Sequence, residues 1–194
     1  LPSSAAVSAA LCLYLCESGA NCSVRLVLEP SSIRPSKLPG HVNIVSTTPR
    51  SKGKSIFNDL PVSSGFEEVM SASEALTILK DVTQPLRDRG LIKGNELLVF
   101  ASRASLRRLE EWQLRAEIQA IADSSNLLTN LTITPSMIRP TVLLSAELKN
   151  PGNLSAANII AQHKDESTTM GYVRKLPYRI ILEDRIRSFM NTLQ

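Results

Sequence analysis

Four kinds of side chain that suit chemistry at a phosphate group occur along this sequence of 194 residues. Lys52 and Lys54 come first, Arg139 and His163 follow, and Tyr172 is separated from the histidine by eight residues. Arginine offers phosphate oxygens a planar fork of donors and keeps its charge. Lysine can protonate a leaving oxygen, and histidine can donate to the phosphate or accept a proton. A tyrosine hydroxyl can attack phosphorus and hold the phosphoryl group covalently.

Hydrophobic periodicity predicts the elements that carry the first of these residues. Residues 3–17 form a predicted buried helix that Ser18 and Gly19 end. Residues 42–45 and 55–60 are predicted strands, and the segment between them favours a β-hairpin with a basic tip. The stretch from Pro30 to Asn58 has no acidic residue and five basic ones, namely Arg34, Lys37, Arg50, Lys52 and Lys54.

The second half of the chain is predicted to be mainly helical. A helix over 71–89 has Ser71 as its cap and an apolar face made of Ala72, Ala75, Leu76, Leu79 and Val82. After a short apolar run at 97–100, residues 105–122 form a predicted charged helix with an apolar face of Leu106, Leu109, Trp112 and Ile121. Further helices are predicted at 137–148, with Pro140 in the first turn, and at 154–162, 168–172 and 180–193.

The segment Ile160-Ala161-Gln162-His163-Lys164-Asp165-Glu166-Ser167-Thr168-Thr169-Met170-Gly171-Tyr172-Val173 resembles the second conserved box of the tyrosine recombinases, or phage-type integrases. In that family an apolar helix, a Gly-His pair and a polar run with Thr-Thr precede the tyrosine. The family also separates its histidine and tyrosine by eight residues. Gln162 stands where the family usually has glycine. The resemblance implies that Tyr172 is a covalent nucleophile and that His163 belongs to the site.

Two other motifs extend the resemblance over nearly the whole chain. Residues 133–141, ITPSMIRPT, resemble the family's His-x-x-Arg helix start, with Arg139 on the invariant second arginine and Ser136 in place of the histidine. The basic hairpin resembles the one that carries the family's catalytic lysine. Counting back from Pro61 places Lys52 and Lys54 one residue either side of that lysine, with Lys54 slightly favoured.

One motif departs from the family. In its first box the segment 18–24 puts Asn21 on the first catalytic arginine, and Arg25 lies about one helical turn further on. Arg25 could reach the same phosphate. Losing one preorganised charged donor costs about 10²–10³ in rate. Asn21 and Ser136 together therefore predict a slow enzyme, or one whose missing groups are supplied by Arg25 or by assembly.

The resemblance implies an α+β fold, mainly α, with a small antiparallel sheet, and one catalytic domain over 1–194. It implies cutting and rejoining of double-stranded DNA through a 3′-phosphotyrosine intermediate, with no metal, ATP or other cofactor. Arg25, Arg50, Lys52, Lys54 and Arg139 are the expected DNA contacts. A homodimer or tetramer on DNA is expected, in which the helix at 179–194 docks on a neighbouring protomer or packs on its own domain. The resemblance also implies that the arm-binding and core-binding domains that precede the catalytic domain in such integrases would be absent here.

Composition agrees with a globular protein that has a polyanionic partner. The net charge is +4, with 43% hydrophobic and 21% charged residues. The apolar segment 5–16 has no basic start and is too short to span a bilayer, so we expect a core helix and neither a targeting signal nor a membrane partner. Three reduced cysteines are expected, with Cys12 and Cys16 on one buried helix face. The expected location is the cytoplasm, on the nucleoid, or the nucleus for a eukaryotic element.

Simpler interpretations stay open for several residues. Tyr172 could be a packing residue, His163 a helix-end residue, and Lys52 and Lys54 plain hairpin-tip charges. Ser136 is favoured as a helix N-cap, and Trp112 is favoured as a core residue over a base-stacking platform. Two alternatives to the enzyme remain. One is a degenerate family member that binds DNA without cutting it, and the other is an unrelated helical regulatory domain.

Overall fold

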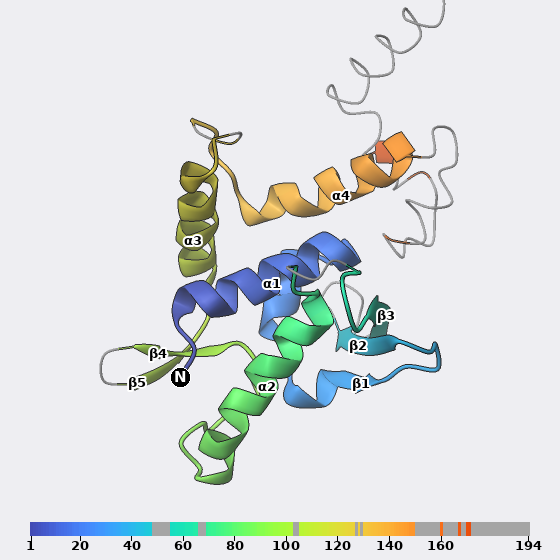
Figure 1. Ribbon diagram of the computed structural model, residues 1–194. Helices are drawn as coiled ribbons and strands as arrows, with labels where there is room; N and C mark the ends of the chain where they lie inside the picture. Colours follow the sequence, from blue (N-terminus) through green and yellow to red (C-terminus); the bar gives the residue numbers. More distant parts are fainter. Residues whose placement is uncertain are drawn as a thin grey trace, which may run out of the picture. The chain divides into compact units, whose positions relative to one another are not determined.

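The computed structural model describes residues 1–47, 55–65, 69–102, 105–126, 128, 130–149, 160, 167 and 170–171. The chain divides into two compact units, Leu1–Ile138 and Arg139–Gln194. The described part is mainly helical with small antiparallel sheets, as predicted (Figure 1). Its elements are α1 (Ser4–Ser18), η1 (Cys22–Leu26), η2 (Pro30–Ser32), β1 (Ile33–Pro35), β2 (His41–Thr47), β3 (Ser55–Pro61), α2 (Ala72–Asp88), β4 (Val99–Ser102), β5 (Ser105–Arg108), α3 (Glu111–Ser124) and α4 (Pro135–Lys149).

Helix α1 lies at the centre of the first unit, where it contacts α2, α3, β3 and β4 (Figure 1). Its start is capped by Ser3, whose hydroxyl accepts a hydrogen bond from the Ala6 amide at 3.2 Å. Its end is set by Gly19, which adopts the left-handed conformation at φ 61° and donates to the Leu15 carbonyl at 3.0 Å. The predicted buried helix is therefore confirmed.

The buried face of α1 does not include both cysteines. It runs through Val7, Leu11, Tyr14, Leu15 and Ser18, so Cys12 lies at its edge, partly buried, and Cys16 is exposed. The prediction that the two thiols share a buried face was wrong. Spacing by one helical turn places two residues on one side of a helix but does not say which side is covered.

The predicted hairpin is confirmed in its strands. β2 and β3 pair antiparallel from His41↔Pro61 to Thr47↔Ser55, and both strands are longer than predicted. A third strand, β1, pairs with β2 through Ile33↔Ile44 and was not predicted. Residues 48–54, which connect the paired strands, lie outside the described part of the chain.

Helix α2 begins as predicted, because the Ser71 hydroxyl accepts from the Glu74 amide at 3.2 Å. A second connection comes from α1, where the Glu17 carboxylate accepts from the Ala72 amide at 2.9 Å. The apolar face was predicted correctly except at Val82, which is exposed. Thr83 is buried instead, and its hydroxyl donates to the Leu79 carbonyl at 2.7 Å. Gly90, at φ 68°, follows the helix end.

The predicted helix at 105–122 was wrong in its first turn and in its buried face. Residues 105–108 are strand β5, paired with β4 through Ser102↔Ser105 and Val99↔Arg108. The helix begins only at Glu111, where Glu110 and Gln113 form a reciprocal capping box. Leu114, Ile118 and Ala122 are its buried residues, whereas Trp112 and Ile121 are exposed by 68% and 50%. The expectation of a core tryptophan was therefore also wrong.

Helix α4 begins at Pro135, two residues earlier than predicted, so Pro140 lies inside the helix and not in its first turn. The predicted helices at 154–162 and 180–193 fall almost entirely outside the described residues. Met170 and Gly171, near the end of the predicted helix at 168–172, are helical. No helix in the described ranges is both long enough and apolar enough to cross a membrane.

Nearly all buried apolar side chains of the first unit form a single core. Leu97 and Leu98 join it from the approach to β4, and Leu109 joins it from between β5 and α3. The central members are Leu11, Tyr14, Leu15, Leu28, Ile44, Leu76, Leu97, Leu98, Leu109 and Leu114. This core fixes the hairpin, η1 and the start of α3 around α1.

Candidate active site

Asn21 serves as a structural cap. Its side-chain oxygen accepts a hydrogen bond from the Ser23 amide at 3.1 Å, and this bond starts the short helix η1. The side chain is uncharged and exposed. Asn21, the residue predicted to take the place of the first arginine, thus organises the local backbone.

Arg25 lies in the last turn of η1 and is held by an acidic partner from a distant part of the chain. Its Nη2 donates to Oε2 of Glu111 at 3.1 Å, and Glu111 is the first residue of α3. The Arg25 side chain is only 9% exposed, while that of Glu111 is 58% exposed. The Nε of Arg25 is buried without a hydrogen-bond partner among the described residues. A buried guanidinium needs a counter-charge, and Glu111 supplies it.

The three-stranded sheet includes both strands of the hairpin, β2 and β3, between which the basic tip is predicted. Arg50, Lys52 and Lys54 lie outside the described residues. On the strands themselves, Asp59 accepts from Ser36 at 2.6 Å and from Asn43 at 2.8 Å. Hydrogen bonds from Ser36 and Asn43, together with the charge of His41, hold the pKa of Asp59 below its usual value. These contacts connect β3 to β2 and to the segment that follows β1.

Ser136 and Arg139 lie near the start of α4, three residues apart. Ser136 is the second residue of the helix, so the interpretation of its side chain as the N-cap was wrong. Its hydroxyl is within 2.9 Å of the Thr134 hydroxyl, and the Thr134 carbonyl accepts from the Met137 amide at 2.9 Å. Arg139 is partly buried and is the first residue of the second unit. Residues three apart on a helix lie on neighbouring positions of its surface.

His163 and Tyr172 lie outside the described residues. Their roles, and those of Lys52 and Lys54, therefore stay predictions. The backbone immediately before Tyr172 is helical at Met170 and Gly171.

Two features of the described region had no signal in the sequence. One is Glu111, which pairs with Arg25 across 86 positions of sequence. The other is a partly buried polar contact in which Asn58 Nδ2 of β3 donates to the Tyr14 hydroxyl of α1 at 2.9 Å. Both are contacts between distant segments, and periodicity within one segment carries no information on them.

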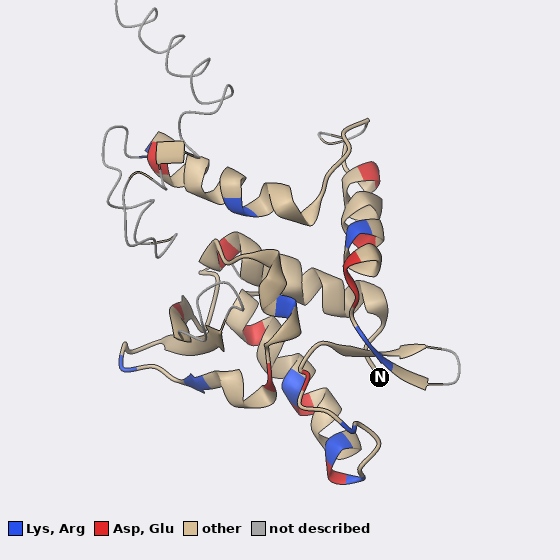
Figure 2. Cartoon of the chain, turned by 180° about the vertical axis from the view of Figure 1, so that it is seen from behind, with Lys and Arg blue, Asp and Glu red and all other residues tan. Residues whose placement is uncertain are grey.

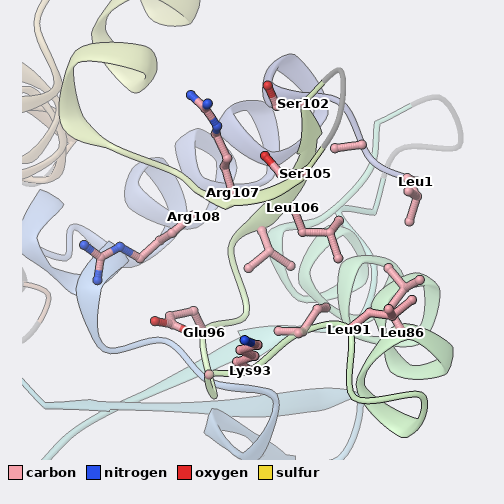
Figure 3. A pocket seen from close by; sticks show the side chains of 14 residues that line it. Leu1, Leu86, Leu91, Lys93, Glu96, Ser102, Ser105, Leu106, Arg107 and Arg108 are labelled. Atoms are coloured by element: carbon pink, nitrogen blue, oxygen red, sulfur yellow. The ribbon is translucent and has the colours of Figure 1, made fainter.

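A surface pocket of about 820 Å³ lies between the end of α2, the loop after it and the β4–β5 hairpin. Figure 3 shows its leucine side chains, with the guanidinium groups of Arg107 and Arg108 pointing away from them. None of the predicted catalytic residues lines this pocket. The pocket therefore has no part in the predicted chemistry at phosphate.

Figure 2 shows acidic and basic residues interspersed along α2 and α3 rather than a single basic face.

Within the described residues, neither the cysteines nor any group of potential metal ligands is arranged for catalysis. Burial raises the pKa of Cys12 to about 12 and also raises the pKa values of Cys16 and Cys22. A thiol with a raised pKa is a poor nucleophile at neutral pH. Within the described residues, no group of histidine, cysteine and acidic side chains is placed to hold a metal ion.

Comparison with known proteins identifies the fold. No protein-family model matches the sequence. No curated protein matches it either. Among solved structures, the chain is similar to the XerH site-specific recombinase bound to a palindromic difH substrate in a post-cleavage complex, with a TM-score of 0.64 and 16% identity over 96% of this chain and 47% of that one. The chain is also similar to the pre-cleavage complex of XerH with difH, with a TM-score of 0.62 and 16% identity over 93% of this chain and 47% of that one. Its similarity to the XerA recombinase has a TM-score of 0.52 and 17% identity over 96% of this chain and 64% of that one.

The predicted fold is thereby confirmed: the chain, mainly helical with small antiparallel sheets, has the fold of the part of the XerH and XerA recombinases that it matches. The chain spans about half the length of XerH and 64% of XerA. At these identities the likeness concerns the fold, and the activity of this chain has to be argued from its residues.

Proposed function

We propose that this chain is the catalytic domain of a site-specific DNA recombinase that cuts and rejoins double-stranded DNA with Tyr172 as nucleophile. The observation that carries the proposal is the combination of this fold with Arg139, His163 and Tyr172 in the family's order and spacing. Fold alone does not specify chemistry. The ordered residues alone could arise by chance. Together they favour one reaction.

In the proposed reaction the Tyr172 hydroxyl attacks phosphorus in line with the 5′-oxygen. The P–O5′ bond breaks, a 3′-phosphotyrosine forms, and Lys54 or Lys52 donates a proton to the leaving oxygen. Arg139 binds the non-bridging oxygens, where charge accumulates, and His163 donates to the phosphate or takes the tyrosine proton. A 5′-hydroxyl from another strand then attacks the phosphotyrosine and restores the diester. The bond energy is conserved in the phosphotyrosine, so the scheme uses no ATP. Cationic side chains stabilise the charge on the phosphate, so the scheme also uses no metal.

Arg25 is the proposed substitute for the first arginine, but its binding to a phosphate would require it to give up its contact with Glu111. Its guanidinium is bound to Glu111 at 3.1 Å and is largely buried. A phosphate could take over only if it displaced that carboxylate. We therefore propose slow cleavage, in which Arg25 contributes to DNA binding after Glu111 releases it, while Ser136 contributes a neutral donor.

The decisive experiment uses a suicide DNA substrate, which loses its 5′-hydroxyl fragment after cleavage and so traps the covalent adduct. We expect an adduct with the unaltered chain and none with Tyr172→Phe. Tyr178→Phe is the matched control, because it removes the same hydroxyl from the neighbouring tyrosine. Equal adduct yields from Tyr172→Phe and the unaltered chain on cognate DNA would refute the assignment of the nucleophile.

A second candidate function is DNA binding without cleavage. The observations that favour it are Asn21, which is engaged as a cap, and Arg25, which is engaged by Glu111. Under this alternative, binding is salt-sensitive and survives Tyr172→Phe, and no adduct forms with any tyrosine present.

Assembly on DNA is part of the proposal. We propose that a dimer or tetramer forms on DNA and that residues 179–194 dock on a neighbouring protomer. Deletion of these residues should leave single-site DNA binding intact and remove the higher complexes in a gel-shift titration. Unchanged higher complexes would show that the segment packs on its own domain or has no part in assembly.

A further inference from the structure

Trp112 is an exposed aromatic residue that the proposed reaction does not use. It is the only tryptophan of the chain and the second residue of α3, and 68% of its surface is exposed. Tryptophan side chains are highly buried on average. Large, rigid aromatic side chains that are left exposed are typical of binding surfaces, where a partner covers them. The indole ring of Trp112 therefore suits a partner with a flat face.

A pocket of about 690 Å³ lies beside the indole ring. Helix α3 forms one wall with Trp112 and Gln119, and residues 132–134 form the other. Gln119 fixes the second wall to the helix, because its Nε2 donates to the Leu131 carbonyl at 3.0 Å and its Oε1 accepts from the Ile133 amide at 3.0 Å. The volume lies in the range of small-molecule pockets, about 300–1,000 Å³. A preformed space thus adjoins a flat aromatic ring.

The pocket borders two residues of the candidate active site. Glu111 lines the pocket, and its carboxylate is bound to Arg25 at 3.1 Å. Thr134 also lines the pocket, and its hydroxyl is within 2.9 Å of the Ser136 hydroxyl. Arg25 and Ser136 are two of the groups proposed to contact the phosphate. A nucleotide bound at either residue therefore lies next to the pocket.

The charges around the pocket favour a ligand that carries phosphate. Two carboxylates line the pocket, but each is bound to an arginine at 3.1 Å, Glu110 to Arg108 and Glu111 to Arg25. Arg115 also lines the pocket, is exposed, and forms no ion pair with any described residue. Three arginines and two glutamates leave one net positive charge. This balance favours a nucleotide over a cationic ligand.

From this placement we infer that Trp112 is a stacking platform for an unpaired DNA base beside the cleaved bond. The inference rests on the proposed function. After cleavage, the strand that ends in the 5′-hydroxyl has to leave its complementary strand before it attacks a second phosphotyrosine. The bases next to the cut then lose their pairs and their stacking neighbours. An aromatic side chain replaces that stacking and accepts any base, because every base has a π-face.

Intrinsic fluorescence tests the contact directly, because the indole emission of this chain comes from Trp112 alone. A base that stacks on the ring quenches this emission. The probes are two single DNA strands of equal length, one of oligothymidylate and one made of abasic nucleotides, which carry the same number of phosphates. The anisotropy of a dye at the strand end reports how much of each strand the full chain has bound. At equal saturation we expect quenching by oligothymidylate and none by the abasic strand.

Two substitutions on α3 separate stacking from general effects on the helix. Trp112→Ala should weaken the binding of oligothymidylate by about 5- to 150-fold, which corresponds to the loss of one stacked base, and leave the binding of the abasic strand unchanged. Trp112→Phe keeps an aromatic ring and should recover most of the loss. Ile121→Ala is the matched control, since Ile121 is 50% exposed on the same helix and lies about two and a half turns further on, on the opposite side. It should change neither affinity nor quenching.

A cognate suicide substrate locates the stacked base. A single abasic nucleotide is placed at successive positions of either strand, and the indole emission of the bound chain is measured for each. Quenching should disappear only when the abasic position adjoins the cleaved bond. Loss of quenching at distant positions alone would overturn the placement beside that bond.

Three other results would overturn the inference. Equal quenching by the two single strands would show that the ring contacts the DNA backbone, and no quenching by either would show that DNA does not cover it. Quenching that grows with protein concentration in the absence of DNA would show that a second copy of the chain covers the ring. The proposed function fails separately, if the unaltered chain gives no adduct dependent on Tyr172, because the experiment with single strands requires no cleavage.

Discussion

The pair formed by Arg25 and Glu111 predicts a measurable loss of stability in Glu111→Gln. The substitution leaves the Arg25 guanidinium, which is 9% exposed, with a neutral amide in place of its acid. Breaking a fully buried pair costs about 3–5 kcal/mol. Because the Glu111 side chain is 58% exposed, water screens the interaction and can hydrate the arginine in part. The value for this pair should lie between that of a fully buried pair and that of an exposed one. We therefore expect a loss of about 1–2 kcal/mol in the free energy of unfolding.

The measurement is urea unfolding followed by far-ultraviolet circular dichroism, with Glu74→Gln as the matched control. Both glutamates lie in the first turn of a helix, where a negative charge contributes about 0.3–1 kcal/mol through the helix dipole. The side chain of Glu74 is exposed. The difference between the two variants thus isolates the contact with Arg25. If Glu111→Gln costs no more than Glu74→Gln, the reasoning about the buried arginine is wrong.

The same variant tests the part proposed for Arg25 in DNA binding. If Arg25 can reach a phosphate, removing its competitor should tighten binding and steepen the salt dependence by about one counterion. Adding Arg25→Gln to Glu111→Gln should abolish both gains. A salt dependence that is the same in Glu111→Gln and the unaltered chain would restrict Arg25 to a structural role.

Three further predictions concern the described residues. Ser71→Ala should lower the free energy of unfolding by about 1–2 kcal/mol, since the hydroxyl caps α2; no loss in urea unfolding would argue against the cap. Iodoacetamide at pH 8 should label Cys16, which is exposed, well before Cys12, whose pKa is raised to about 12 by burial; peptide mass mapping reads the order, and faster labelling of Cys12 would contradict it. The lowered pKa of Asp59 means that its contribution to stability is present above its unfolded pKa and is lost as pH falls through the folded one. Asp59→Asn should therefore make the free energy of unfolding fall less steeply as pH drops below about 4, the usual pKa of an aspartate, and an unchanged acid profile would refute this.

The sequence predicted the local features of the fold well, because these depend on short-range physics. The α1 and α2 helices have side-chain caps and glycines that are visible in the sequence. The hairpin strands are flanked by turn-forming residues, and their pairing was predicted correctly. The errors occurred where one pattern fits two structures. Leu106, Leu109 and Trp112 have helical spacing, yet Ser105–Arg108 pairs with β4, and a strand partner cannot be seen from one segment.

The candidate site was predictable in its residue types and less so in its surroundings. Spacing within short motifs selected Arg139, His163 and Tyr172, but only Arg139 and Ser136 among the α4 and C-terminal candidates lie in the described region. Arg25 was chosen for its distance from Asn21. What spacing could not reveal is its burial and its pairing with Glu111, since both depend on how α3 packs.

Helix α1 has a consequence for the order in which the chain can fold during synthesis. It precedes its packing partners in the sequence, it is apolar on nearly every side, and three of its side chains make polar contacts with segments far downstream. The Tyr14 hydroxyl needs Asn58, the Glu17 carboxylate needs Ala72, and the Ser4 hydroxyl donates to Glu117 at 2.6 Å, across 113 positions of sequence. Contacts between residues so far apart in sequence form late, and they lower the folding rate. Until α3 has been synthesised, α1 exposes its hydrophobic surface because its packing partners are missing. It is therefore the part of the chain that a chaperone would need to protect from aggregation.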